Sequence, residues 1–460
     1  MLAFLFAFVA VQLAVALWVA KRIRSEEDFL VAGRQLGPAL AATSIVATWF
    51  GAESCVGAAG AAYEGGLSWN APEPFAYGAC LVLTGLFFAA KLWRLRITTM
   101  ADFLRGRFGP SSERLAAILL LPSSLLWAAA QIRAFGQVVA ANADGAVSVE
   151  AAIGVAAGIA IIYTVAGGLL ADVYTDVVQS AALLVGIAAL AIAVWCHLPA
   201  PDAAAAAAGS LAPSLPTASW LGQLEQWAIP ICGSVVAQEV ISRALAGRSA
   251  SVARNAAIAG GLAYIAVGAI PLTLGALGPR LLPGLQDPES VLPELSRELL
   301  PDALNLLFAG ALISAILSTV DSCLLVASSL VARNLTPRTS ALDAPMDRLR
   351  VARWAVVGGG LIAYALANSD CNVADLVEEA SGFGSAGMFV LACAGLYGTR
   401  GRSLAANATL ITGLVVWIIG RHIAPAAVPH PYLMSLAAAA GAFVIGCALE
   451  RRRSAPARDQ

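Results

Sequence analysis

Charged side chains are scarce in this sequence, and their scarcity decides the class of protein. Only 12% of the 460 residues are Asp, Glu, Lys or Arg, whereas 59% are hydrophobic, and the mean hydropathy is +0.78. Soluble globular domains are typically about 25% charged, so this composition excludes an ordinary soluble protein. It predicts an integral membrane protein whose outer surface contacts the lipid bilayer.

Residues that commonly carry enzyme chemistry are also few. The three histidines, His197, His422 and His430, lie at or near predicted external ends of membrane spans. The eight cysteines are scattered without the spacing of a metal site. A membrane-embedded enzyme would need a nucleophile–base pair or a metal cluster, so an enzyme is disfavoured. Cys196 and Cys371 both lie near external ends, and the sequence leaves open whether they form a disulfide.

Long hydrophobic runs, in contrast, are abundant. A membrane-spanning helix needs about 20 mostly apolar residues, and the sequence holds about thirteen such windows. We therefore expect an all-α polytopic membrane protein. The approximate windows are 2–20, 37–63, 73–92, 115–141, 150–169, 173–197, 223–245, 252–278, 303–332, 351–369, 376–397, 404–423 and 431–449. A short amphipathic helix is expected outside the membrane within 279–302.

Basic residues on alternate loops predict how the chain is oriented. The first window is followed by Lys21, Arg22 and Arg24 without a small-residue cleavage site, so we expect a retained span rather than a signal peptide. Cytoplasmic loops carry an excess of Lys and Arg, which predicts an N-terminus outside and a cytoplasmic C-terminus. The compact loops and the Ala/Arg-rich composition are typical of a bacterial inner membrane. The basic residues after every second window include Arg243, Arg248, Arg254 and residues 451–453.

Two of the predicted spans are interrupted near their centres by small and polar residues. The interruptions are "TSIVATWFGAESCVGAAG" in the second span and "AIPICGSVVAQEVISRA" in the seventh. They lie five spans apart, which suggests a repeat of five spans. Because a repeat with an odd number of spans begins and ends on opposite sides of the membrane, its second copy must run inverted through the bilayer. Such paired broken helices indicate the binding site of a secondary transporter. Gly and Ser can also serve only close helix packing, but packing does not require Glu53 and Glu239.

Hydroxyls and a carboxylate gather in the ninth span, in "SAILSTVDSCLLVASS". Ala315, Ser318, Thr319 and Ser322 share one helical face, and Asp321 flanks it. Membrane hydroxyls often bond the carbonyl four residues back, which does not account for an aspartate. An ionised carboxylate there costs at least about 2.5–3.5 kcal/mol. Hydroxyls from one helix and free carbonyls from a broken one would together suit Na⁺.

A second polar group lies in "GGLLADVYTDVVQS", at the start of the sixth span. Asp172, Thr175, Asp176 and Gln179 share one helical face. We expect Asp172 to be interfacial, where a solvated carboxylate is inexpensive and can cap the helix. Asp176 lies deeper, and its spacing leaves open whether it is a ligand for a cation or a proton.

These stretches resemble the sodium:solute symporter family. The resemblance runs from "DFLVAGRQLG" through "YTVAGGLLADVYTDVVQ" and "SAILSTVDSCLLVASSLVARNL" to "LVEEASGFGSAG", and it is greatest to the high-affinity choline-transporter-like branch. It implies a leucine-transporter-like core of five plus five spans in inverted repeat, and Na⁺-coupled solute uptake. The implied divisions are an extra span and cytoplasmic loop in 1–36, the core in 37–397 with repeats 37–197 and 223–397, two spans in 398–450 and a cytoplasmic tail in 451–460.

The resemblance also implies ligands for the coupling ion, Na⁺. The principal sodium site would consist of the backbone carbonyls of Ala47, Phe50 and Ala315 and the hydroxyls of Ser318 and Thr319. A second site, found in some members, maps to Asp176, Ser318, Asp321 and Ser322. The family usually has a hydroxyl where Asp321 stands, although the choline-like branch resembles this chain in carrying an aspartate. It stays open whether the second site takes Na⁺, takes a proton or pairs with a basic group.

The resemblance also implies a substrate site that contains three aromatic residues. Trp49, Tyr77 and Trp127 match the cage in which the choline-like branch holds a quaternary ammonium by cation–π attraction. Ala237 stands where that branch has a tryptophan, which argues against choline itself. Polar residues near the helix breaks or the cage are Glu53, Gln131, Arg133, Gln238 and Glu239. Either these charges pair with each other, or the carboxylates bind a substrate ammonium while Arg133 binds a carboxylate.

The sequence thus predicts a sodium-coupled symporter that imports a small polar or zwitterionic organic solute by alternating access. The solute would be an amino acid or a betaine-like or choline-like compound. A proton-coupled symporter of the same fold, or a transporter-like sensor acting with a separate protein, remains the alternative. The predicted partners are a small-molecule solute and the lipid bilayer, without nucleic acid, and no protein partner is identified.

Overall fold

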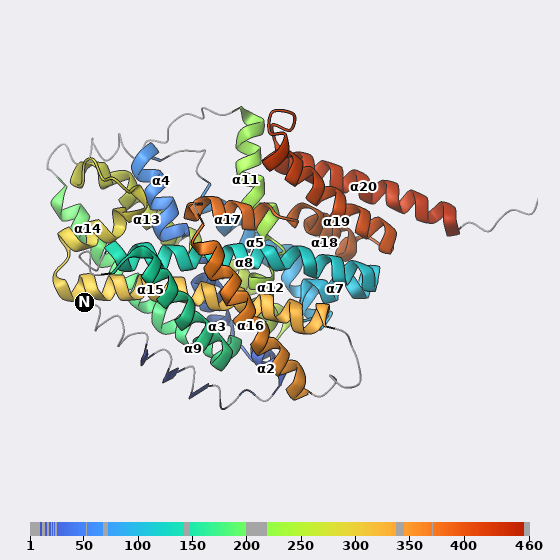
Figure 1. Cartoon of the computed structure of the whole chain (residues 1–460), viewed down its shortest axis with the longest axis horizontal. Helices are drawn as coiled ribbons and strands as arrows, with labels where there is room; N and C mark the ends of the chain where they lie inside the picture. The colour runs from blue at the N-terminus through green and yellow to red at the C-terminus, as the bar shows by residue number, and fades with distance from the viewer. Residues whose placement is uncertain are drawn as a thin grey trace, which may run out of the picture.

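The computed structural model is almost entirely helical (Figure 1). It describes residues 25–51, 53–67, 72–141, 147–198, 219–336, 345–369 and 371–454, with a few isolated positions before residue 25. Within these ranges the structure has no β-strand, and a single backbone bridge joins Leu36 to Gly247. The predicted all-α polytopic fold is confirmed.

The predicted spans coincide with helices wherever they lie in the described residues. Nine helices there are long and apolar enough to cross a membrane, and two bent pairs raise the number to eleven. The first window, 2–20, lies almost wholly outside the described residues. The membrane helices are α3 (Pro38–Trp49), α4 (Ala58–Gly65), α5 (Phe75–Leu83), α6 (Ala90–Arg94), α8 (Pro110–Ala141), α9 (Val149–His197), α11 (Trp220–Ser234), α12 (Gln238–Ala246), α13 (Ala250–Leu281), α15 (Asp302–Ser329), α16 (Pro345–Ala367), α17 (Val373–Gly382), α18 (Ser385–Tyr397), α19 (Ser403–Ile418) and α20 (Pro431–Ser454).

Shorter elements continue or connect these helices. α14 is amphipathic, because Val291, Leu292 and Leu295 are buried while its other face is polar, which confirms the short helix predicted within 279–302. Each of the eight cysteines is a free thiol, so Cys196 and Cys371 do not form a disulfide. The connecting elements are α2 (Glu26–Val31), η1 (Ala32–Arg34), α7 (Met100–Phe108), η4 (Pro288–Ser290) and α14 (Val291–Leu299); the π-helical segments are η2 (Glu53–Gly57), η3 (Thr84–Ala89), η5 (Leu330–Leu335) and η7 (Ile419–Ile423).

Both predicted interruptions are breaks in the helices. α3 ends at Trp49, and the chain resumes through η2 and α4 after a bend of 57°. α11 and α12 meet at a bend of 43°. A Cβ at Gly51 would lie 2.7 Å from Oε1 of Gln131 and 2.9 Å from Oγ1 of Thr319. Glycine therefore lets the first break approach α8 and α15 closely.

α15 lies at the centre of the molecule, where it packs against α8 and α9 (Figure 1). All its residues from Phe308 to Ser329 are buried. α19 and α20, red in Figure 1, pack side by side at one edge. The polar stretch of the ninth predicted span thus lies in the interior of the protein rather than against lipid.

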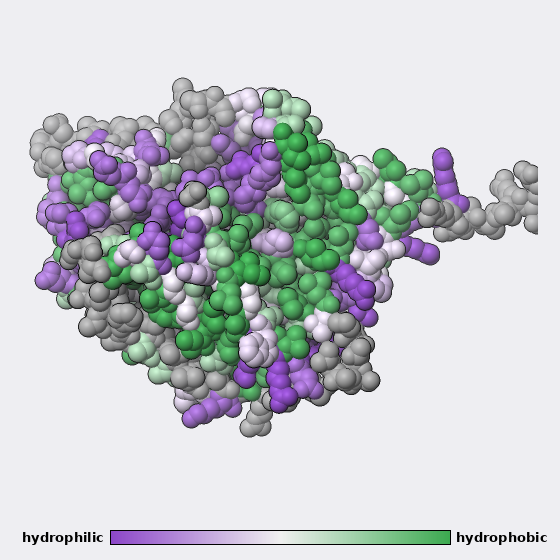
Figure 2. Space-filling model, in the orientation of Figure 1, coloured by the Kyte–Doolittle hydropathy of each residue, from purple (hydrophilic) through white to green (hydrophobic). Residues whose placement is uncertain are grey.

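The outer surface is apolar where lipid would cover it. Figure 2 shows hydrophobic residues gathered over the middle and upper right of the visible face, and hydrophilic residues over its left and upper-left part and along its lower edge. On α9 the apolar residues Val178, Val185 and Ile192 are 63%, 54% and 65% exposed. Their seven-residue spacing places them on one face of the helix, which is the face expected to contact lipid.

α9 covers two predicted windows because the chain bends sharply within it at Gly168. This glycine has φ +54° and ψ −169°, a conformation that side chains with a Cβ rarely adopt. A Cβ there would lie 2.5 Å from Cδ2 of Phe29 in α2. The bend therefore depends on glycine for both its backbone conformation and its packing.

We expect Gly168→Ala to lower the free energy of unfolding by at least about 2 kcal/mol, since it combines backbone strain with overpacking. Thermal unfolding of the purified protein measures the loss. Gly158→Ala is the matched control in the same helix, because a Cβ at Gly158 meets no atom within 4 Å. Equal melting temperatures for the two variants would contradict this account of the bend.

Candidate functional site

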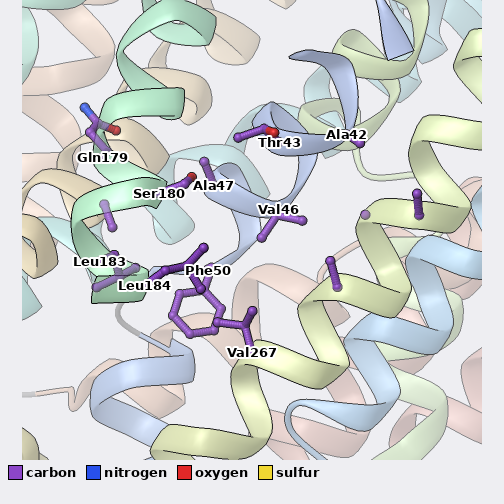
Figure 3. Close-up of a pocket in the computed structure, with 14 residues that line it drawn as sticks. Ala42, Thr43, Val46, Ala47, Phe50, Gln179, Ser180, Leu183, Leu184 and Val267 are labelled. Carbon is purple, nitrogen blue, oxygen red and sulfur yellow. The ribbon is translucent and has the colours of Figure 1, made fainter. Parts of the chain in front are cut away.

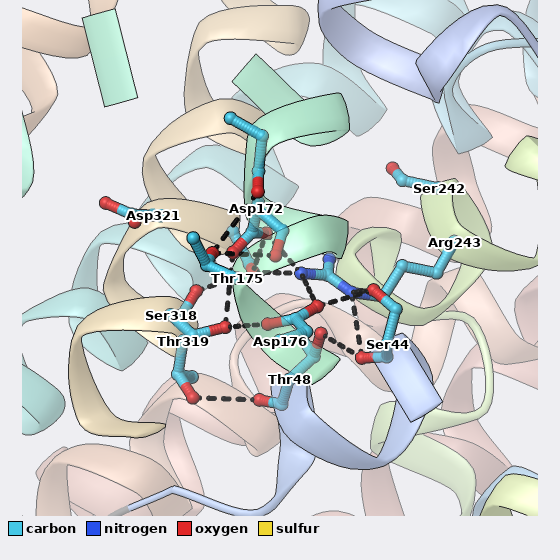
Figure 4. A network of polar contacts seen from close by, with 12 residues as sticks. Ser44, Thr48, Asp172, Thr175, Asp176, Ser242, Arg243, Ser318, Thr319 and Asp321 are labelled. Atoms are coloured by element: carbon cyan, nitrogen blue, oxygen red, sulfur yellow. Dashed lines mark hydrogen bonds and ion pairs between the residues drawn. The ribbon is translucent and has the colours of Figure 1, made fainter. Parts of the chain in front are cut away.

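Six buried polar residues from four helices meet in the interior of the protein (Figure 4). They come from α3, α9, α12 and α15, and each is at most 1% exposed. We call them the central ion-pair network. Its members are Ser44 of α3, Asp172 and Asp176 of α9, Arg243 of α12, and Ser318 and Ser322 of α15.

Arg243 connects the network. Its Nη2 lies 2.5 Å from Oδ2 of Asp172 and donates at 2.5 Å to Oγ of Ser322. Its Nε donates at 3.1 Å to Oγ of Ser44, and Nη2 lies 3.9 Å from Oδ2 of Asp176. The planar guanidinium presents several donors in a fixed geometry, so one side chain joins α12 to α3, α9 and α15.

These contacts correct two expectations from the sequence. Asp172 is not a solvated capping residue, because its carboxylate is 1% exposed and pairs with Arg243. Arg243 is not a residue of a cytoplasmic loop, because its own side chain is also 1% exposed. The sequence interpretation missed the pair because each residue lies beside other polar residues near a predicted span end, and 71 positions separate them in the sequence.

Asp176 is held by hydroxyl groups. Ser44 Oγ donates to its Oδ2 at 2.6 Å, and Ser318 Oγ donates to its Oδ1 at 2.5 Å. Ser318 also lies 3.2 Å from Oδ1 of Asp172. The two aspartates therefore share one hydroxyl and one guanidinium, which offset the cost of burying two carboxylates.

Asp321 lies beside the network, and its carboxylate is hydrogen-bonded to Thr164, which is not a member of the network. Its Oδ1 accepts a hydrogen bond of 2.6 Å from Thr164 Oγ1 of α9, and Figure 4 shows it apart from the residues around Arg243. The structure thus brings Asp176, Ser318 and Ser322 together, whereas it places Asp321 against Thr164. Of the interpretations that the sequence left open for the second site, this arrangement favours pairing with a basic group, Arg243.

The break after α3 releases backbone oxygens toward α15. In a continuing helix the N–H of Gly51 would bond the carbonyl of Ala47, but it donates at 3.0 Å to the carbonyl of Trp49 instead. On the facing helix, Thr319 Oγ1 donates at 3.0 Å to the carbonyl of Thr48 and at 3.2 Å to that of Ala315. The break and α15 therefore meet through backbone oxygens and a hydroxyl, which are ligand types suited to a hard cation.

A cavity of about 280 Å³ lies beside this contact, between α3, α9 and α13 (Figure 3). Ala47, Phe50 and Ala315 line it, which are three of the five residues implied for the principal sodium site. Its other walls are mainly apolar, with Thr43, Gln179 and Ser180 as the polar exceptions. Ser318 and Thr319, the two hydroxyl residues implied for that site, are not among the residues that line the cavity.

The three cage residues are close together, but they contact one another. The ring centroids of Trp49 and Tyr77 are 5.3 Å apart, those of Trp49 and Trp127 are 4.9 Å apart, and those of Tyr77 and Trp127 are 6.0 Å apart. These are the separations of packed aromatic pairs. In this arrangement the rings form a closed cluster that leaves no space for a cation between them.

Two other residues predicted to bind substrate, Arg133 and Gln238, form hydrogen bonds to the backbone of neighbouring segments. Arg133 Nη1 donates to the carbonyls of Ala367 and Ser369 at 3.1 and 2.7 Å, at the C-terminal end of α16. A cation is favourable there because of the helix dipole. Gln238 accepts a hydrogen bond of 2.6 Å from the N–H of Met100. Both side chains are thus engaged with backbone groups.

Glu239 lies at a small internal cavity of about 20 Å³, which Trp127 and Ala237 also line. Its Oε1 accepts a hydrogen bond of 2.7 Å from Ser124 Oγ. Glu53 lies elsewhere, at a cavity of about 460 Å³ that Tyr77 also lines. The carboxylates that follow the two breaks therefore do not face one common pocket in this structure.

Comparisons with known proteins agree with this architecture. The model of the sodium:solute symporter family matches residues 29–413. High-affinity choline transporter 1 of Drosophila melanogaster is 28% identical over 377 residues, covering 77% of this chain and 60% of the transporter. The human choline transporter is 28% identical, covering 77% of this chain and 65% of the transporter. The match thus spans less than two thirds of either choline transporter.

A bacterial relative matches over most of both chains. The high-affinity proline transporter PutP of Bacillus subtilis is 27% identical over 439 residues, covering 88% of this chain and 89% of PutP. These relatives are transporters, which confirms that class over an enzyme.

Two solved structures share the fold. A Na⁺-coupled sialic acid symporter in a substrate-bound outward-open state has a TM-score of 0.81 and 18% identity, covering 100% of this chain and 98% of the other. The transporter Mhp1, with bromovinylhydantoin bound in a closed conformation, has a TM-score of 0.63 and 17% identity, covering 92% and 94%. The predicted leucine-transporter-like fold is thereby confirmed. Since the family model matches most of its length, this chain belongs to the sodium:solute symporter family.

Proposed function

We propose that the protein is a Na⁺-coupled symporter that imports a small polar or zwitterionic organic solute by alternating access. The observation that supports it most directly is the meeting of the α3 break with α15. There the N–H of Gly51 donates to the carbonyl of Trp49 rather than to that of Ala47, and Thr319 donates to the carbonyl of Thr48 at 3.0 Å. A cation bound by both segments would tie a broken helix to a continuous one.

Two cavities on opposite sides of Arg243 differ in volume. At the end that the distribution of Lys and Arg predicts to be external, α4, α11 and α17 enclose the cavity of about 460 Å³. On the other side of Arg243, a cavity bordered by Ser242 and Ser322 has a volume of only about 10 Å³. This asymmetry supports an arrangement open toward the outside and closed toward the cytoplasm.

Sodium would act on this arrangement through α3 and α15. If Na⁺ binds better when the two segments are close, it stabilises the outward-facing state to which substrate binds. The affinities for Na⁺ and substrate must then be coupled to the same extent in both directions. Arg243 supplies a fixed positive charge beside Asp172 and Asp176, so the coupling ion need not neutralise both carboxylates.

A ligand screen by thermal unfolding tests the proposal. Purified protein would be melted with amino acids, betaines, choline, short organic acids and sugars, each in NaCl and in matched KCl. A ligand present at about 100 times its Kd stabilises the folded state by about 2.7 kcal/mol. We expect one nitrogen-containing class to stabilise the protein in NaCl but not in KCl. Equal effects of the two salts would contradict sodium coupling, and stabilisation in KCl that grows on acidification would indicate proton coupling.

A further inference from the structure

The external cavity is bordered by more carboxylates than its basic residue can neutralise. Glu53, Glu73 and Glu378 line it, and among the described residues Arg421 is the basic one that does. Arg421 is already engaged, because its Nη1 lies 3.1 Å from Glu378 and its Nε lies 3.0 Å from Glu379. Glu53 and Glu73 are therefore left without a neighbouring cation from the cavity wall.

One carboxylate oxygen of Glu73 accepts hydrogen bonds, whereas the other is buried beside the cavity without a hydrogen-bond partner in the described part of the chain. Ser54 Oγ donates to its Oε1 at 2.6 Å, and the hydroxyl of Tyr264 donates to the same oxygen. Oε2 has no hydrogen-bond partner among the described residues. The side chain is only 7% exposed, so leaving this acceptor unmatched costs about 1–3 kcal/mol or more. A ligand that donates to Oε2 would recover that cost.

The ligand group that fits is a cation with N–H donors. A quaternary ammonium carries no N–H and is held by the faces of aromatic rings. The rings of Trp49, Tyr77 and Trp127 are packed against one another here, and of the three Tyr77 alone lines the external cavity. A primary or secondary ammonium can instead donate charge-assisted hydrogen bonds to carboxylates, which are roughly twice as strong as neutral ones.

We propose that Glu73 and Glu53, with Tyr77 beside them, form a subsite for a primary or secondary ammonium group of the transported solute. This inference rests on the proposed function, because it assumes that the external cavity admits the solute. It narrows the solute to organic cations or zwitterions whose nitrogen keeps at least one hydrogen. The two carboxylates would also make the cavity attractive to cations before binding.

A methylation series tests which nitrogen is recognised. The affinities of ethanolamine, N-methylethanolamine, N,N-dimethylethanolamine and choline would be measured by calorimetry on the purified full-length protein in NaCl. We expect affinity to fall as N–H groups are lost, with ethanolamine binding about tenfold or more tightly than choline, since one such hydrogen bond is worth about 1.5–3 kcal/mol. Tighter binding of choline, or no binding by any member, would overturn the inference.

The matched variants are Glu73→Gln and Glu64→Gln. Glu64 is exposed on α4 and is not among the residues that line the cavity. We expect Glu73→Gln to weaken ethanolamine binding about tenfold and Glu64→Gln to leave it unchanged; equal affinities in the two variants would overturn the inference. The shift in melting temperature caused by NaCl without any amine reports on the proposed function separately. A sodium shift without an amine effect would refute the subsite alone, whereas loss of the sodium shift in the wild-type protein would refute sodium coupling.

Discussion

The Arg243→Ala variant will lose about 3–5 kcal/mol of unfolding free energy, because removing one partner of a buried ion pair leaves an uncompensated charge. In this case two carboxylates, Asp172 and Asp176, would remain within a packed interior, and Asp172 would lose the cation 2.5 Å from its Oδ2. Hydroxyls of Ser44 and Ser322 would lose a donor as well. Thermal or chemical unfolding of the purified variant measures the effect.

Two further variants separate the ion pair from a general sensitivity to losing arginine. Arg254→Ala is the control, since Arg254 is an exposed residue of α13 that contacts its neighbour Asn255, and we expect a change within about 0.5 kcal/mol. The double variant Asp172→Val/Arg243→Met replaces the pair by hydrophobic residues of roughly similar volume. Such replacements are often near neutral, so it should recover much of the lost stability. If Arg243→Ala were as stable as Arg254→Ala, the pair would not hold the resting structure together.

The helices and their breaks were predictable because they depend on local sequence. The length of an apolar run shows directly whether it can span a bilayer. Small residues such as Gly51 mark a possible helix break, whichever helices pack against them in the fold. The bend at Gly168 lies near the boundary between the spans predicted over 150–169 and 173–197, so this division was predictable as well. The predicted division of the chain into repeats and C-terminal spans stays a prediction.

The side-chain partners were less predictable because they join distant positions. Arg243 was assigned to a loop from its charge, since hydropathy treats an arginine as exposed unless its partner is known. Arg133 donates to carbonyls at the end of α16 that lie 234 and 236 residues away in sequence, and its role at the substrate stays a prediction. Glu73 precedes α5 in a segment expected to begin a span, and only the fold brings Ser54 and Tyr264 to it.

The second large effect is expected from Thr319→Ala. Thr319 is the side chain of α15 that bonds a carbonyl of the broken helix, at 3.0 Å from Thr48. Losing one oxygen ligand of a cation should weaken Na⁺ binding by about 1.5–3 kcal/mol, which corresponds to roughly a tenfold or greater rise in the Na⁺ concentration for half-maximal uptake. Uptake by cells or proteoliposomes at varied Na⁺ and fixed substrate measures it.

Ser328→Ala is the matched control for that variant, because Ser328 is buried in the same helix and its hydroxyl donates at 2.8 Å to the helix's own carbonyl of Leu325. It removes the same kind of group without touching the break, so its sodium dependence should equal that of the wild-type protein. Adding Ser318→Ala to Thr319→Ala should raise the required Na⁺ further while expression stays near normal. Ser318 also donates to Asp176, so a change in pH dependence that appears only in the double variant would come from Asp176. Unchanged sodium dependence in both Thr319→Ala and the double variant would contradict the proposal that the coupling ion binds between α3 and α15.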